Sequence, residues 1–215
     1  MIDIVLPCLD EAGALPWVLA RIPDDARAIV VDNGSSDGSA AIARAHGALV
    51  VTARRRGYGA ACDAGLRAAT ADLVAFCDCD ASLDPGDVIR LAQPVLAGDA
   101  DLVVGRRRAV GRGAWPLTPR IANWELARRI RRRTGLPVTD LGPLRVARRE
   151  ALLGLGIEDR RSGYPLETLV RAVDAGWRIE QHDVAYRPRV GRSKVTGTVL
   201  GCIHAVRDMS AVLAS

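Results

Sequence analysis

The chain has 215 residues, of which 49% are apolar, and its formal net charge is +5. These values are ordinary for one globular domain with a substantial core. The N-terminus shows no signal-peptide pattern, and no apolar stretch approaches the ~20 residues of a membrane-spanning helix. The five cysteines form no CxxC pair, so neither a disulfide framework nor a zinc ribbon is predicted, and a reduced, cytoplasmic compartment is the simple interpretation.

The first half of the chain alternates apolar runs with amphipathic segments. We expect strands at residues 3–6, 28–31, 48–52, 73–77 and 101–105, and helices at 12–21, 36–46, 59–69 and 85–96. Strands separated by helices imply parallel βαβ units, so the fold class is α/β, with a mostly parallel, Rossmann-like sheet flanked by helices. In such sheets, ligands bind beyond the carboxyl ends of the strands.

The second half of the chain is less regular. We expect, in order, a basic helix at 116–133, a strand at 142–146, a helix at 165–175, a strand at 178–186, a basic loop at 187–197 and an amphipathic helix at 199–213. No repeat or linker marks a boundary, so residues 1–215 are expected to form a single domain. Residues 1–105 would form the half that carries the ligand edge, and residues 106–215 would complete the site above it.

Asp78-Cys79-Asp80 ends the fourth expected strand and is the most informative motif. Two carboxylates one residue apart resist joint ionisation, and a hard divalent cation with oxygen ligands would relieve that repulsion. The alternative is a strand-end turn with two solvated aspartates. Polar or glycine-rich segments also follow the first three strands, at residues 7–11, 32–38 and 54–61, which places four such segments at one edge of the sheet.

Taken together and in this order, these segments resemble an inverting GT-A glycosyltransferase of family 2, in its dolichyl-phosphate mannose synthase-like branch. Residues 6–11 are similar to the family's "PxxNE" start, 30–38 to "VDDGSxDG", 56–61 to "GxGxA", and 78–80 to the metal-binding DxD. Further on, residues 139–145 resemble "DxxxGFR", and 163–167 and 192–195 resemble later Glu and "SK" motifs. Two positions depart from the pattern: Asp10 replaces an Asn, and Asn33 replaces the second Asp of "VDDGS".

The resemblance implies transfer of a hexose, with inversion, from a UDP- or GDP-linked sugar. It implies that Asp78 and Asp80 hold Mg²⁺ or Mn²⁺ on the diphosphate, where the metal offsets the charge of the leaving group, so Asp80 also counts as catalytic. The helix after Gly59 would offer free N–H groups towards phosphate. The implied donor-binding residues are Pro7, Leu9, Glu11, Asp32, Gly34, Ser35, Gly57, Gly59 and Asp78.

The implied acceptor is a polyprenyl phosphate or a small soluble hydroxyl compound. Asp140 would be a general base for a hydroxyl, or would complete the metal or phosphate shell for an anionic acceptor. Glu167 is a second catalytic candidate, with a salt bridge to Arg171 as the alternative. The residues implied to bind an acceptor phosphate are Arg145, Arg192, Ser193 and Lys194, the last being the one lysine of the chain.

The basic segment 115–133, with Trp115 and Trp124, suits peripheral contact with the inner face of a membrane, but a solvated Arg-rich face is an equal alternative. The Gly loop at 56–61 superficially echoes a dinucleotide-binding oxidoreductase, yet it follows the third strand and lacks a third glycine. No nucleic-acid recognition motif accompanies the basic charge. A non-catalytic nucleotide-binding protein remains as the alternative from a different class.

Overall fold

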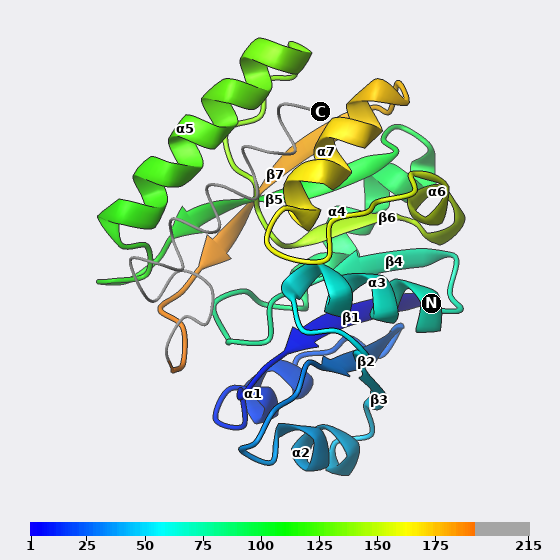
Figure 1. Ribbon diagram of the computed structural model, residues 1–215, viewed down its shortest axis with the longest axis vertical. Helices are drawn as coiled ribbons and strands as arrows, with labels where there is room; N and C mark the ends of the chain where they lie inside the picture. The colour runs from blue at the N-terminus through cyan, green and yellow to red at the C-terminus, as the bar shows by residue number, and fades with distance from the viewer. Residues whose placement is uncertain (192–215) are drawn as a thin grey trace.

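The computed structural model describes residues 1–191, which form a seven-stranded sheet with helices on both faces (Figure 1). The strands are β1 (Ile2–Cys8), β2 (Ala26–Asp32), β3 (Leu49–Thr52), β4 (Leu73–Phe76), β5 (Leu102–Ala109), β6 (Arg145–Arg148) and β7 (Ile179–Tyr186). The helices are α1 (Leu15–Leu19), α2 (Ser39–Ala45), α3 (Tyr58–Ala68), α4 (Asp87–Ala97), α5 (Leu117–Thr134), α6 (Arg149–Gly154) and α7 (Tyr164–Asp174). Arg192, Ser193, Lys194 and the expected helix at 199–213 lie outside the described residues.

The strand order is β3-β2-β1-β4-β6-β5-β7, and the pairs are parallel except at β6. Strand β6 runs antiparallel between β4 and β5, with Leu73 opposite Arg148 and Leu102 opposite Ala147. The predicted α/β class with a mostly parallel sheet is confirmed. The strand expected at residues 142–146 is present as β6, shifted to residues 145–148, whereas its antiparallel direction and helix α6 were not predicted.

Strand β5 is longer than its apolar run indicates. The apolar residues end near Gly105, but the strand continues through three arginines to Ala109, because residues 106–109 pair in register with residues 183–186 of β7. Backbone pairing with a neighbouring strand therefore determines where β5 ends.

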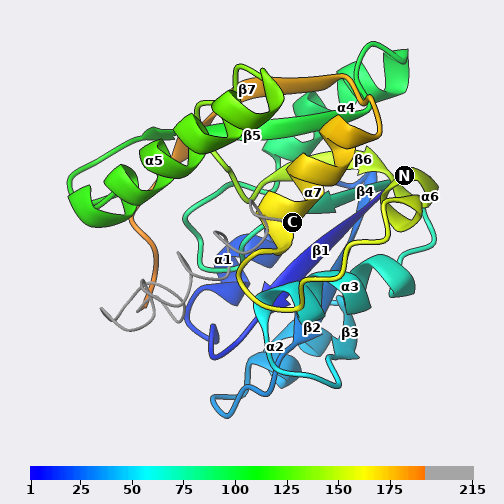
Figure 2. The same cartoon turned by 45° about the horizontal axis from the view of Figure 1, so that its top comes forward.

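Two hydrophobic clusters, one on each face of the sheet, form the core, and Figure 2 shows the helices that lie on these two faces. Side chains alternate along the strands, so that on β1 Ile4 and Leu6 point into one cluster and Val5 points into the other. Helices α1, α2 and α4 cover the first face, while α3, α5, α6 and α7 cover the second. Within residues 1–191, no helix combines the length and apolar character needed to span a bilayer.

Candidate active site

The segments that follow β1 and β2 hold each other at the carboxyl edge of the sheet. The Asp10 N–H donates to Ser35 Oγ (3.0 Å), and Asp10 Oδ1 accepts the Ser36 N–H (2.7 Å). The Glu11 N–H donates to Ser39 Oγ (2.9 Å), and Asp32 Oδ1 accepts the Ser35 N–H (2.9 Å). The structure therefore brings the predicted donor-binding segments 7–11 and 32–35 into direct contact, with Asp10 at a φ of 52°, a conformation that Asp tolerates.

Asn33 joins the second of these segments to the glycine loop. The Asn33 side-chain NH₂ donates to the Gly57 carbonyl (2.7 Å), and the Asn33 side-chain oxygen accepts the Gly57 N–H (3.3 Å). A carboxylate offers acceptors alone, so Asp at this position would lose the bond to the carbonyl. Asn33, which departs from the "VDDGS" pattern, thus joins its own segment to the glycine loop through bonds to both the N–H and the carbonyl of Gly57.

The N-terminus of α3 faces another part of the chain. The Gly59 and Ala60 N–H groups donate to the carbonyls of Arg161 and Arg160, both at 2.9 Å. A Cβ on Gly57 would lie 2.1 Å from the Arg160 carbonyl oxygen, so this close approach requires glycine. The expectation that α3 offers free N–H groups to a phosphate is wrong for these two groups, because the loop at 158–161 already binds them.

Glu167 holds that loop in place. Its carboxylate accepts the N–H groups of Glu158 (3.0 Å) and Asp159 (2.6 Å), and the guanidinium of Arg171 donates to it at 2.6 Å. The alternative foreseen for Glu167, a salt bridge to Arg171, is confirmed, and its catalytic role stays a prediction. The contacts that the structure shows are those of a residue that positions the loop on Gly57 and Gly59.

Asp78 and Asp80 lie just beyond β4, where burial and mutual repulsion act on them. Burial first, and then the charge of Asp80, raise the pKa of Asp78 to about 6. The Tyr58 hydroxyl donates to Asp78 Oδ1 at 3.2 Å, and Asp80 Oδ1 accepts the Ser82 N–H at 3.0 Å. Burial and repulsion thus make the charged form of Asp78 less favourable than in water, and a bound cation would favour that charged form.

Two arginines from the second half of the chain face this pair. Arg189 Nη2 lies 3.4 Å from Asp80 Oδ2, and the Val190 N–H donates to the Asp80 carbonyl (2.9 Å), which ties the segment after β7 to the loop after β4. Arg107, on β5, is near enough for its charge to lower the pKa of Asp78, as Arg189 also does. Two carboxylates and two guanidinium groups therefore share one edge of the sheet.

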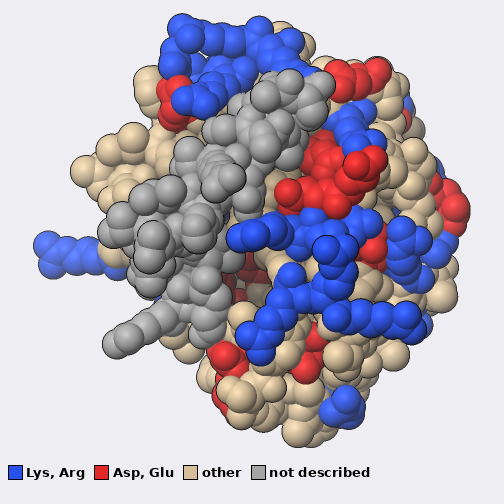
Figure 3. All heavy atoms as spheres, viewed as in Figure 1, with Lys and Arg blue, Asp and Glu red and all other residues tan. Residues whose placement is uncertain are grey.

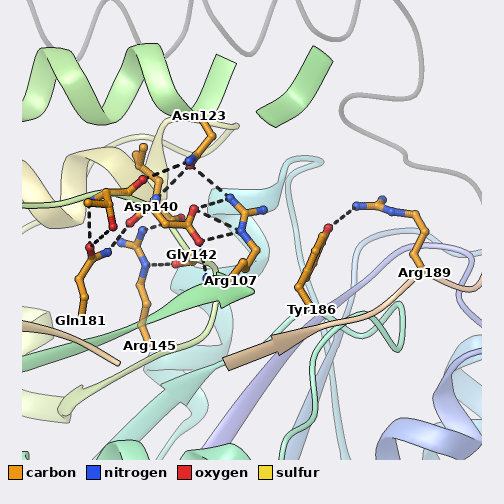
Figure 4. Close-up of polar contacts among 10 residues, drawn as sticks. Arg107, Asn123, Asp140, Gly142, Arg145, Gln181, Tyr186 and Arg189 are labelled. Atoms are coloured by element: carbon orange, nitrogen blue, oxygen red, sulfur yellow. Dashed lines mark hydrogen bonds and ion pairs between the residues drawn. The ribbon is translucent and has the colours of Figure 1, made fainter. Parts of the chain in front are cut away.

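Arg107 is itself held by Asp140 (Figure 4). Its Nη2 lies 2.7 Å from Asp140 Oδ1, its Nε 3.0 Å from Oδ2, and its backbone N–H also donates to Oδ2 (2.7 Å). Asn123 from α5 accepts from Arg107 Nη2 at 3.3 Å, and the Gln181 amide donates to the Asp140 carbonyl at 2.6 Å. The Arg107 guanidinium also lies over the Trp115 ring, 4.4 Å from its centroid. Both oxygens of the predicted catalytic Asp140 are thus engaged in fixing Arg107.

Arg145 lies inside the protein rather than at the acceptor side. Its guanidinium donates to the carbonyls of Gly142 (2.9 Å), Leu141 (3.2 Å) and Pro165, and the residue is 3% exposed. Burial lowers its pKa to about 10. Because three backbone carbonyls already occupy this guanidinium, the structure does not bring it to the surface where an acceptor phosphate would bind, and that predicted role has no support here.

Sequence reasoning missed Tyr58, Arg107, Asn123, Gln181 and Arg189. Tyr58 stands inside the "GxGxA" segment and could have been noticed beside the two glycines. In a chain with so many arginines, nothing local separates Arg107 or Arg189 from the rest. Within residues 1–191, no group of three or more His, Cys, Asp or Glu gathers as a metal site. Among those described residues, a metal at Asp78 and Asp80 would therefore find no third carboxylate, thiol or imidazole ligand gathered around it.

The family model described as "Glycosyl transferase family 2" matches residues 3–155 of the chain. An uncharacterised glycosyltransferase of Mycobacterium tuberculosis is 52% identical over 213 residues, which cover 99% of this chain and 97% of that protein. A dolichyl-phosphate hexose transferase of Haloferax volcanii is 30% identical over 196 residues, which cover 89% of this chain and 85% of the relative.

The solved structures point the same way. Glucosyl-3-phosphoglycerate synthase from Mycobacterium tuberculosis, crystallised with Mn²⁺, UDP and glucosyl-3-phosphoglycerate, matches with a TM-score of 0.75 and 25% identity. That likeness covers 99% of this chain and 78% of the other. Because the family model spans well over half of the chain and the 52% relative spans nearly all of it, the resemblance carried by the sequence motifs is confirmed: the chain belongs to glycosyltransferase family 2.

Proposed function

We propose that this glycosyltransferase moves a hexose from a UDP- or GDP-linked sugar, with inversion, to an acceptor that carries a phosphate group. The observation that carries the proposal is the carboxylate pair of half-buried Asp78 and buried Asp80, faced by Arg107 and Arg189 at the ligand edge of the sheet. Carboxylates suit a divalent metal, and guanidinium groups suit phosphate oxygens. The site is therefore arranged to gather a cation and several phosphate anions.

The residues present fit Mg²⁺ or Mn²⁺. Burial and the charge of Asp80 raise the pKa of Asp78, and a divalent cation would remove the cause of that rise. Mg²⁺ commonly takes one or two protein carboxylates and completes its shell with substrate phosphates and water. When bound, the metal would offset the negative charge that develops on the departing diphosphate. The glucosyl-3-phosphoglycerate synthase was crystallised with Mn²⁺ and UDP, which supports this assignment.

The contacts of Asp140 favour a phosphate acceptor over a bare hydroxyl. A hydroxyl needs a general base, but both Asp140 oxygens are held by Arg107. A phosphate monoester is mostly anionic at neutral pH, since its second pKa is about 6, and it needs positive partners instead of a base. Arg107, fixed by Asp140 and Asn123, is a pre-positioned partner of that kind.

The phosphate could belong to a polyprenyl lipid or to a soluble compound, and relatives support each source. The Haloferax volcanii relative is a dolichyl-phosphate hexose transferase, whereas the synthase from Mycobacterium tuberculosis was also crystallised with UDP-glucose and phosphoglyceric acid. Both acceptors present a phosphate, which is the chemistry that Arg107 and Arg189 suit. A soluble phosphate compound that receives the sugar on a hydroxyl would still need a base other than the engaged Asp140. The base- and ribose-side contacts predicted for Pro7, Leu9, Glu11, Asp32, Gly34 and Ser35 remain part of this proposal.

The test supplies radiolabelled UDP-glucose or GDP-mannose with Mn²⁺, together with either a polyprenyl-phosphate lipid extract or a soluble metabolite fraction. Each acceptor fraction is used with and without prior phosphatase treatment. We expect one fraction to accept label, and phosphatase treatment or a chelator to abolish the transfer. Label in the organic phase identifies a lipid acceptor, and label in the aqueous phase identifies a soluble one.

Asp80→Asn should abolish transfer, whereas Asp72→Asn should not. Asp72 is a matched control because it lies at the other end of β4 with an 88% exposed side chain. Undiminished transfer to a phosphatase-treated acceptor would overturn the phosphate assignment. Full transfer in the chelator would overturn the metal assignment.

A further inference from the structure

The outward face of α5 is apolar over its first two turns. Leu117, Ile121 and Trp124 are 70%, 55% and 57% exposed. Their spacing of four and three residues places them on one side of the helix. The opposite side packs into the core through Leu126 and Ile130, which are almost fully buried. A helix that is already anchored in the core therefore presents a second apolar stripe away from it.

The last two turns of α5 are basic. Six arginines and a single glutamate lie between Leu117 and Thr134, an excess equal to the formal charge of the whole chain. Arg128 and Arg132 continue the stripe of Trp124 at four-residue steps, and Arg128 and Arg129 both bind Glu125. Figure 3 shows the basic side chains gathered over the C-terminal end of the helix, at the top of the view.

The two properties together select the partner. A second protein surface would suit Leu117, Ile121 and Trp124 but would have to neutralise the adjacent arginines. Exposure to water would suit the arginines, but it leaves three apolar side chains unburied, which is unfavourable. The boundary of an anionic bilayer meets both needs, because apolar side chains enter the acyl region while guanidinium groups contact lipid phosphates.

The position of α5 relates this surface to the site. Asn123, on the inward side of the helix, binds both Arg107 and the Leu141 N–H beside Asp140. A helix with its side chains is about 10–12 Å across, so a membrane on the outer face would lie roughly that far from these residues.

We propose that α5 docks the protein on anionic lipid membranes, with Leu117, Ile121 and Trp124 inserted and the arginines of its last turns on the headgroups. This inference does not depend on the transfer chemistry, because a membrane-docked enzyme can act on a lipid or on a soluble acceptor. It concerns a surface outside the carboxylate pair.

The test is co-sedimentation of the full chain with vesicles of phosphatidylcholine alone or mixed with phosphatidylglycerol, without donor or acceptor. We expect binding to the anionic vesicles that weakens as salt is raised. Arg128→Gln with Arg132→Gln should weaken binding about thirtyfold, since each basic residue near such a surface contributes about a factor of five. Arg44→Gln with Arg148→Gln, two exposed arginines on other elements, is the matched control and should bind as the parent does.

Tryptophan emission locates the contact. Vesicles should shift the emission to the blue, and Trp124→Phe should remove that shift, while Trp177→Phe, between α7 and β7, should leave it. Equal binding to both lipid compositions, or a blue shift that survives Trp124→Phe, would overturn the proposal. So would a protein that ignores vesicles but forms a dimer that Ile121→Ser with Trp124→Ser disrupts, because the stripe would then be an interface between two copies.

Discussion

Replacing Asp78 with Asn should make the metal-free protein more stable while removing a metal ligand. The pKa of Asp78 is about 6 in the folded protein, against an ordinary value of 3.8. A raised carboxyl pKa means that the native state binds the proton more tightly than the unfolded state. The native protein therefore loses stability as the pH rises from about 4 to about 6, and the whole penalty is present at neutral pH.

The size of the effect follows from the shift. About two pKa units at 1.36 kcal/mol each give at most about 3 kcal/mol, because Asp78 is partly exposed and water screens its charge. For a chain of this length, 1 kcal/mol moves the melting temperature by about 2–4 °C. Asp78→Asn should then melt up to about 6–12 °C above the parent at neutral pH. Asn keeps an oxygen that can accept the Tyr58 hydroxyl, so the change mainly removes the charge.

The assay is thermal melting together with guanidinium unfolding, both in chelator and at several pH values between 4 and 8. The parent should lose stability over the lower half of that range, and Asp78→Asn should lose less. Added Mn²⁺ should reverse the order at neutral pH, because a ligand that binds only the native state stabilises it. Asp72→Asn, which changes an exposed carboxylate just before the start of β4, should follow the parent. A variant no more stable than the parent at neutral pH in chelator would refute the reasoning.

Three further predictions concern the glycine loop and its supports. Gly57→Ala should lower the free energy of unfolding in chemical denaturation by more than about 3 kcal/mol, because the new Cβ would lie 2.1 Å from the Arg160 carbonyl oxygen. Its control, Gly154→Ala, has open space around the new Cβ and should change that free energy by less than about 0.5 kcal/mol. Glu167→Gln should lower the free energy of unfolding by about 1.5–3 kcal/mol, because charge-assisted hydrogen bonds are lost. It should also make the loop at 158–161 more susceptible to proteolysis, and an unchanged proteolysis rate would contradict the positioning role. Tyr58→Phe should weaken Mn²⁺ binding in a calorimetric titration, most clearly below pH 7, because the pKa of Asp78 rises further without the hydroxyl; equal affinity at every pH would contradict this.

The sequence predicts well the features that depend on neighbouring residues. The strands up to Phe76 are recognisable from their apolar runs, and the polar segments after them fall at one edge because parallel strands share a direction. The contact between residues 10–11 and 35–39 follows from the same rule. These features need no knowledge of how the second half of the chain returns to the sheet.

Features that depend on distant contacts were not predictable in this way. Nothing near Gly59 indicates that carbonyls a hundred residues later bind the N-terminus of α3. Arg145 belongs to a motif that predicted contact with an acceptor phosphate, yet its guanidinium donates to three backbone carbonyls inside the fold. The same residue type serves on the surface of α5, inside the core and against Asp140, and only the tertiary structure separates these uses.

The position of β6 has a consequence for synthesis. Residues 1–105 include the first half of β5, but β4 and β5 are not neighbours: the strand between them is β6, which is formed by residues 145–148. While the ribosome makes the segment between residue 105 and β6, one edge of β4 is unpaired. Because β4 is fully buried and apolar in the folded protein, that edge could pair with another nascent chain. Expression in two pieces cut after residue 105 should therefore yield insoluble fragments unless both are made together, because the central gap of the sheet is filled from the second piece.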